Sequence, residues 1–183
     1  MAERYLLDTN AYFAVLKYIS SRETGNTAIE NVLNGECYIS KATQIEIISV
    51  IGKYARGSNG GTQICERIHD GAVEKCGMKY VVKKKKKWSQ AKLRDWLKLE
   101  KEVSTGVNIL FNVSILEMNS TVIKEAERFI QNALLYNFKS MDSIIVGTAL
   151  ANSNEGNKMV VVTADKALKA GMDQINFPHI SIT

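Results

Sequence analysis

Short apolar segments that alternate with amphipathic ones constrain the fold of this chain most strongly. Apolar runs suited to strands occupy residues 4–8, 37–39 and 158–163. Segments with helical spacing of their apolar side chains occupy residues 10–19, 24–33, 40–54, 120–135 and 141–151. Ser40 and Gly57 suit the start and the end of the third helix. This alternation predicts an α/β fold, with a central parallel sheet and helices on both faces.

The middle of the chain follows a less regular pattern. We predict a loop at residues 58–61, helices at 62–73 and 88–103, and a strand at 78–82. In the C-terminal part, we predict a strand within residues 107–117, a helix from 165 to 170, and strands at 175–177 and 180–182. We therefore predict a single domain over residues 1–183, in which residues 58–105 form an insertion or a small subdomain.

Positive charge is concentrated in one segment. The whole chain carries a net charge of +5, whereas residues 79–101 alone contain ten Lys or Arg and only two acids. A basic segment next to an aromatic ring is typical of contact with a nucleic acid. An alternative is a solvated hairpin tip that only aids solubility. The candidate contact residues are Lys83, Lys84, Lys85, Lys86, Lys87 and Trp88.

Composition excludes several other classes of site. The three cysteines lack CxxC spacing and there are two histidines, so neither a zinc site nor histidine acid–base chemistry is expected. No run reaches the ~18 apolar residues of a membrane span, and the N-terminus lacks the apolar core of a signal peptide. We therefore expect a cytoplasmic protein that does not enter a membrane.

Two carboxylates follow the ends of predicted strands. Asp8 ends the first strand, and Asp165 comes two residues after the strand that contains MVVVT. Ligands of an open parallel sheet bind beyond the carboxyl ends of its strands, so both residues are candidates for a site. An Asp between a strand and a helix is also a common N-cap, and that alternative stays open for each of them.

Two further carboxylates lie in predicted helices. Asp142 falls in the first turn of its helix, where stabilisation by the helix dipole is the simpler explanation. Glu46 lies among isoleucines, and a polar stripe shared with Ala42, Ser49 and Lys53 would also explain it. Clustered carboxylates suit Mg²⁺ or Mn²⁺, and such an ion activates water and stabilises charge on a phosphate.

Four segments together resemble the PIN-domain nucleases. They read LLDTNAYF, ISKATQIEIISVI, SMDSIIVGTAL and VVVTADKAL, and they follow in order from residue 4 to about residue 170. The resemblance implies a three-layer sandwich and a metal-dependent endonuclease that cleaves RNA. It also implies that Asn10 and Thr163 support the first and last aspartates by hydrogen bonds. The implied metal ligands and catalytic residues are Asp8, Glu46, Asp142 and Asp165.

The resemblance also suggests partners. Many prokaryotic members are VapC-type toxins of toxin–antitoxin pairs, which implies an antitoxin protein and a homodimer with a basic groove. The apolar side of the helix around Trp96 is a candidate for the dimer contact, and core packing is the alternative. A haloacid dehalogenase-type phosphatase is disfavoured because position 10 is Asn rather than Asp, whereas a non-catalytic RNA-binding module stays open.

Overall fold

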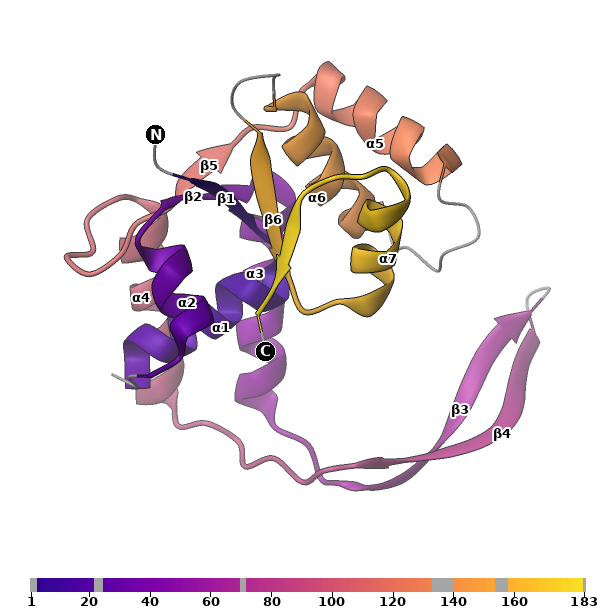
Figure 1. Cartoon of the computed structure of the whole chain (residues 1–183). Helices are drawn as coiled ribbons and strands as arrows, with labels where there is room; N and C mark the ends of the chain where they lie inside the picture. The colour runs from indigo at the N-terminus through magenta and orange to yellow at the C-terminus, as the bar shows by residue number, and fades with distance from the viewer. Residues whose placement is uncertain (1–2, 22–24, 70–71, 133–139, 154–157, 183) are drawn as a thin grey trace.

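A five-stranded parallel sheet forms the centre of the molecule (Figure 1). The structure is a computed structural model that describes residues 3–21, 25–69, 72–132, 140–153 and 158–182. The strand order is β5-β2-β1-β6-β7, and each neighbouring pair runs parallel, as predicted. The strands are β1 (Arg4–Leu7), β2 (Glu36–Ser40), β5 (Ser114–Leu116), β6 (Met159–Thr163) and β7 (His179–Ser181).

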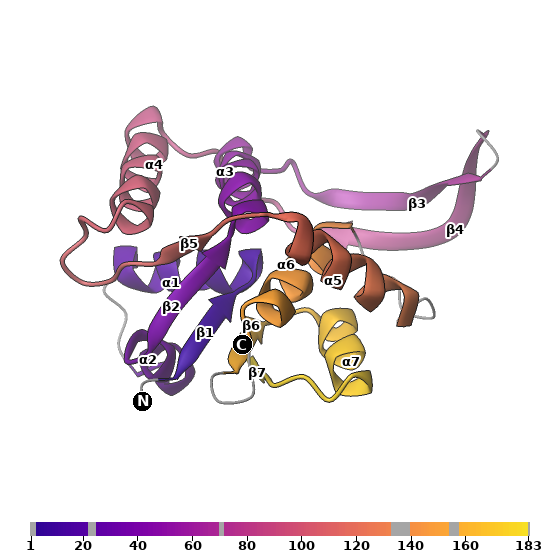
Figure 2. The same ribbon diagram turned by 90° about the horizontal axis from the view of Figure 1, so that it is seen from above.

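Helices cover both faces of the sheet, which confirms the predicted sandwich (Figures 1 and 2). One face carries α1 (Thr9–Ser21), α2 (Thr27–Leu33), α3 (Lys41–Arg56) and α4 (Gln90–Ser104). The other face carries α5 (Ser120–Asn132), α6 (Ser140–Ala151) and α7 (Lys166–Gln174). Because strand side chains alternate, Tyr5 and Leu7 enter the first core while Leu6 enters the second.

The ends of α3 match the sequence. The Ser40 hydroxyl accepts a hydrogen bond from the Thr43 N–H at 3.0 Å, and Gly57 ends the helix with a positive φ of 69°. A Cβ at Gly57 would lie 2.5 Å from the Lys85 carbonyl oxygen, so glycine also permits the later chain to cross here. These two residues fix where α3 starts and where the next segment leaves.

The predicted helix at residues 62–73 is wrong. Residues Gly61–His69 form β3, which pairs antiparallel with β4 (Ala72–Val82), and the hairpin extends away from the rest of the molecule (Figure 1). Ile64 and Ile68 have helical spacing, but Ile68 instead pairs with Val73 across the hairpin. That residues 58–105 are an insertion stays a prediction.

Helix α4 belongs to the first core. Trp96 is only 8% exposed, and its ring stacks on that of Phe13 with centroids 5.0 Å apart. The core-packing alternative is therefore correct for Trp96, and this side chain is not available as a dimer contact. Among the described residues, no helix is both long and apolar enough to cross a membrane.

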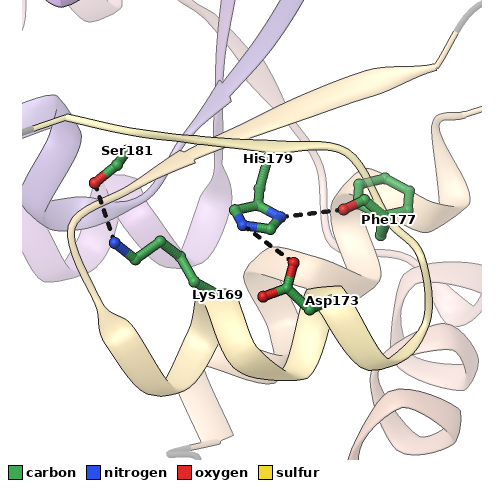
Figure 3. A network of polar contacts seen from close by, with 5 residues as sticks. All are labelled: Lys169, Asp173, Phe177, His179 and Ser181. Carbon is green, nitrogen blue, oxygen red and sulfur yellow. Dashed lines mark hydrogen bonds and ion pairs between the residues drawn. The ribbon is translucent and has the colours of Figure 1, made fainter.

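The C-terminal strand is attached to α7 by polar contacts (Figure 3). His179 Nε2 lies 3.6 Å from Asp173 Oδ1, and Lys169 donates a hydrogen bond to the Ser181 hydroxyl at 3.1 Å. The predicted strand at residues 175–177 is wrong, because Ile175 caps α7 and the Phe177 N–H donates to the Met172 carbonyl. His179 thus lies on the edge strand of the sheet and contacts α7.

Replacing glycine with alanine is expected to have opposite effects on stability at two helical positions, Gly147 and Gly52. A Cβ at Gly147 on α6 would lie 2.7 Å from both the Ala126 nitrogen and the Val122 oxygen of α5. Gly147→Ala should therefore separate these helices and lower the free energy of unfolding by about 1–3 kcal/mol. Gly52→Ala on α3 is the matched control, since its Cβ meets only the Arg56 guanidinium at 3.4 Å, and it should stabilise the protein by up to about 1 kcal/mol. Urea unfolding measures the free energy of unfolding of both variants. Equal changes in the two variants would contradict the packing argument.

Candidate active site

The sheet brings the two predicted strand-end carboxylates to one edge. Strands β1 and β6 are parallel neighbours, with Leu7 beside Val162. The Asp8 N–H continues this pairing by donating to the Val162 carbonyl at 3.0 Å. Asp165 follows two residues after the end of β6. The carboxylates of Asp8 and Asp165 therefore leave adjacent strands at the same end of the sheet.

Asp8 is a buried carboxylate in a negatively charged setting. It is 3% exposed, and its Oδ1 accepts a hydrogen bond from the Ala11 N–H at 2.6 Å. Burial is the main cause that raises the pKa of Asp8 to about 6. Hydrogen bonds from Thr163 and Ala11 oppose this shift, whereas the charges of Asp142 and Asp165 add to it. The three aspartates therefore share one electrostatic environment.

Thr163 links the ends of the two central strands. Its hydroxyl donates to Asp8 Oδ2 at 2.5 Å and accepts from the Asp165 N–H at 3.0 Å. Asp165 is also the N-cap of α7, because its Oδ1 accepts from the Ala167 and Leu168 N–H groups at 2.8 and 3.0 Å. The capping alternative is thus correct for Asp165. Both capping bonds use Oδ1, so the cap orients the carboxylate without occupying Oδ2.

Glu46 is held beside Asp8 by a residue that the sequence interpretation missed. Glu46 Oε2 accepts a hydrogen bond at 2.6 Å from the hydroxyl of Thr9, which is buried and directly follows Asp8 in the chain. Asp142 lies in the first turn of α6 and is half-buried. All four predicted carboxylates thus have a defined place, with Asp142 and Asp165 acting electrostatically on Asp8 and Glu46 joined to its neighbour.

The donor set fits a hard divalent cation. Carboxylate oxygens are the ligands that Mg²⁺ and Mn²⁺ prefer, and a cation would offset the mutual repulsion that raises the Asp8 pKa. Within the described ranges, no three acidic, histidine or cysteine side chains already converge as a metal cage. The hydroxyls of Thr9 and Thr163 instead hold individual carboxylates in place, as hydrogen-bonding partners of ligands commonly do.

The support for Asp8 that the resemblance implies from Asn10 stays a prediction. It is exposed and lines a hollow of about 250 Å³ together with Lys53, Tyr54 and Lys85. Thr163, not Asn10, provides the side-chain hydrogen bond to Asp8 in the described part of the chain. Asn10 therefore lies at the surface, two residues after Asp8.

The lysine run lies at the base of the hairpin and not at its tip. All five residues from Lys83 to Lys87 are exposed. Lys85 and Ser58 exchange backbone hydrogen bonds of 2.9 and 3.0 Å, so the run passes the C-terminal end of α3. The Lys85 ammonium also lies 4.4 Å from the centre of the Tyr54 ring. The ring of Trp88 is half-buried, 5.1 Å from that of Trp96.

Comparison with known proteins agrees with this geometry. A profile of the PIN domain matches residues 5–171. Among solved structures, VapBC2 of Rickettsia felis bound to a promoter DNA fragment has a TM-score of 0.53 at 13% identity, covering 97% of this chain and 98% of that one. FitAcB of Neisseria gonorrhoeae has a TM-score of 0.50 at 14% identity, covering 96% of each chain. No curated protein matches the sequence.

Because the identities are low, the structural similarity supports the fold and nothing further. The family profile covers most of the chain, from β1 to the middle of α7. It includes all four carboxylates, as well as Thr9 and Thr163, whose hydroxyls donate to Glu46 and Asp8. The chain therefore belongs to the PIN domain family.

Proposed function

We propose that this protein is a divalent-metal-dependent endoribonuclease. The observation that carries the proposal is the buried Asp8 carboxylate, whose pKa is raised in part by the charges of Asp142 and Asp165. Buried like charges are costly unless a cation or a proton offsets them. Membership of the PIN domain family supports hydrolysis of a phosphodiester, and the basic segment supports RNA as the polymer.

In this mechanism Asp8, Glu46, Asp142 and Asp165 would hold Mg²⁺ or Mn²⁺. When bound, such an ion would lower the pKa of a water and offset negative charge at the scissile phosphate. Thr163 links Asp8 to Asp165 through its hydroxyl, and Thr9 hydrogen-bonds to Glu46 beside Asp8. These hydroxyls would reduce the reorganisation that the carboxylates need when an ion binds.

We also propose a toxin role with an antitoxin partner in the cytoplasm. Support comes from the structural neighbours, which are complexes such as VapBC-1 of nontypeable Haemophilus influenzae, with a TM-score of 0.50 at 11% identity, covering 97% of each chain. A homodimer is part of this proposal. Ile45 and Ile48 on α3 are 64% and 45% exposed, which gives a dimer an apolar contact that Trp96 cannot. Sedimentation showing a monomer at tens of micromolar would reject the dimer.

A metal titration tests the nuclease proposal. The purified chain should cleave a structured RNA when Mn²⁺ or Mg²⁺ is added, and excess chelator should stop the reaction. Binding of the RNA without cleavage at any metal concentration would support the rival function, a non-catalytic RNA-binding module. Cleavage that persists in chelator would contradict the metal requirement.

The lysine run is the proposed contact with RNA phosphates. Replacing the five lysines from Lys83 to Lys87 with serine should weaken RNA binding and flatten its salt dependence. Each lost phosphate contact should remove roughly 0.7 from the slope of log K against log salt for a single strand. Lys124→Ser on α5 is the control, since α5 lies on the opposite face of the sheet. An unchanged slope in the fivefold variant would leave the run without a role in binding.

A further inference from the structure

A hollow of about 470 Å³ lies between α1, α3 and α4, on the face of the sheet opposite α5–α7. Four aromatic side chains from three separate segments line it. They are Phe13, Tyr54, Trp88 and Trp96. Trp96 is buried, whereas the other three rings are half-buried, so parts of their surfaces remain open to the hollow.

The four rings contact one another in a closed circuit. Phe13 stacks on Tyr54 and on Trp96, with centroid distances of 4.5 and 5.0 Å. Trp88 lies 5.1 Å from Trp96 and 6.5 Å from Tyr54, at tilted angles. The circuit holds each ring in a fixed orientation, which lowers the entropic cost of stacking another planar group on it.

Lysines surround the rings. Lys17 and Lys92 line the hollow, and the Lys92 ammonium lies 4.9 Å from the centre of the Trp88 ring. The Lys85 ammonium lies 4.4 Å from the centre of the Tyr54 ring, and both residues line the smaller hollow. The lining also contains one acid, the exposed Asp95. Aromatic rings and cations gathered at one place match a base joined to phosphates.

A second hollow lies next to the aromatic one. The smaller hollow lined by Asn10, Lys53 and Lys85 shares Tyr54 with the aromatic one. Helix α3 carries residues of both places, with Glu46 at the carboxylates and with Lys53 and Tyr54 at the hollows. A helix rises 1.5 Å per residue, so Glu46 and Tyr54 are about 12 Å apart along its axis, a distance that a few nucleotides span.

We infer that the aromatic hollow binds one unpaired base of the substrate, a few nucleotides from the scissile phosphate. This inference rests on the proposed nuclease function and adds a subsite to it. The lysines that line the two neighbouring hollows favour a nucleic acid over a protein segment, because an apolar peptide would gain nothing from these cations.

Binding of a short single-stranded oligouridylate to the full chain in chelator tests the subsite without requiring cleavage. Trp88→Leu removes the π-face and should weaken binding on the order of tenfold, whereas Trp88→Phe should retain most of it. The oligonucleotide should also quench tryptophan fluorescence in the native protein. Tyr38→Leu, a half-buried ring on β2 that packs against the other core, is the matched control and should bind normally.

The outcomes separate the subsite from the nuclease function. Normal binding by Trp88→Leu, or a lack of binding by the native chain, would overturn the base subsite, and the hollow would then be left to a protein segment. Such a result would leave metal-dependent cleavage standing, since cleavage is measured separately. If Trp88→Leu fails to fold, Lys92→Ser serves instead, because Lys92 is exposed: it should weaken binding several-fold, and Lys124→Ser should not.

Discussion

Asp8→Asn is expected to stop cleavage and, at the same time, to raise the melting temperature of the metal-free protein. The pKa of Asp8 is raised from its ordinary value of 3.8 to about 6, mainly by burial. At neutral pH the native state therefore holds a charge that the unfolded state carries at lower cost. The penalty is about 3 kcal/mol at ~1.4 kcal/mol per pKa unit, and a neutral amide of the same shape avoids it.

The sign of the pH dependence follows from the same shift. Below about pH 4 the Asp8 carboxyl is protonated in both states and has no effect on stability. Between about 4 and 6 the native state retains a proton that the unfolded state has lost, so stability falls as the pH rises. The metal-free native protein should therefore lose stability across this window, and Asp8→Asn should lose less.

Asp165→Asn is the matched control for this prediction. Asn caps a helix about as well as Asp does, so α7 should keep its N-cap and the melting temperature should change little. Both variants should be inactive, because each lacks a proposed metal ligand. Thermal unfolding in chelator compares their stabilities. A melting temperature of Asp8→Asn below that of the native protein would contradict the argument from burial.

Millimolar Mn²⁺ or Mg²⁺ is expected to stabilise the native protein strongly above pH 7 and weakly near pH 5. An ion that binds only the native state adds about 2.7 kcal/mol at a hundredfold excess over its Kd. For a chain of this size, that corresponds to a rise in Tm of roughly 5–10 °C. Near pH 5 the ion must displace the proton that Asp8 retains, so the rise should shrink.

Asp142→Asn shows whether such a shift comes from the carboxylates. This variant removes a charge that acts on Asp8 and should therefore lose most of the metal-induced rise. An equal rise in Asp142→Asn and the native protein would mean that the ion binds elsewhere. The absence of any rise in the native protein would count against a carboxylate site.

The sheet and two of its acidic residues could be predicted because their signals are local. Apolar strands such as MVVVT are distinct in the sequence, and parallel strands necessarily bring their carboxyl ends to one edge. Asp8 and Asp165 follow from that rule. Ser40 and Gly57 likewise mark helix ends through their own backbone preferences. The family resemblance added Glu46 and Asp142, which periodicity alone had left ambiguous.

The parts of the fold and of the site that were not predicted depend on contacts between segments far apart in the sequence. Nothing in the sequence near Thr9 shows that its hydroxyl meets Glu46, because α1 and α3 are brought together only by the folded core. The aromatic circuit likewise joins α1, the end of α3 and the start of α4. The hairpin was missed because the spacing of Ile64 and Ile68 suits a helix, and pairing with the partner strand prevailed.

The most direct test of the central claim compares RNA cleavage in Mn²⁺ by two variants, Asp142→Asn and Asp173→Asn. Both changes remove one carboxylate charge at nearly constant shape. Asp142 acts on the buried Asp8, whereas Asp173 is exposed and faces His179 at the far end of α7. The account predicts that Asp142→Asn loses activity by a factor on the order of a hundred or more while Asp173→Asn cleaves normally. Equal activity of the two variants would contradict the assignment of the four carboxylates as a metal-dependent nuclease site.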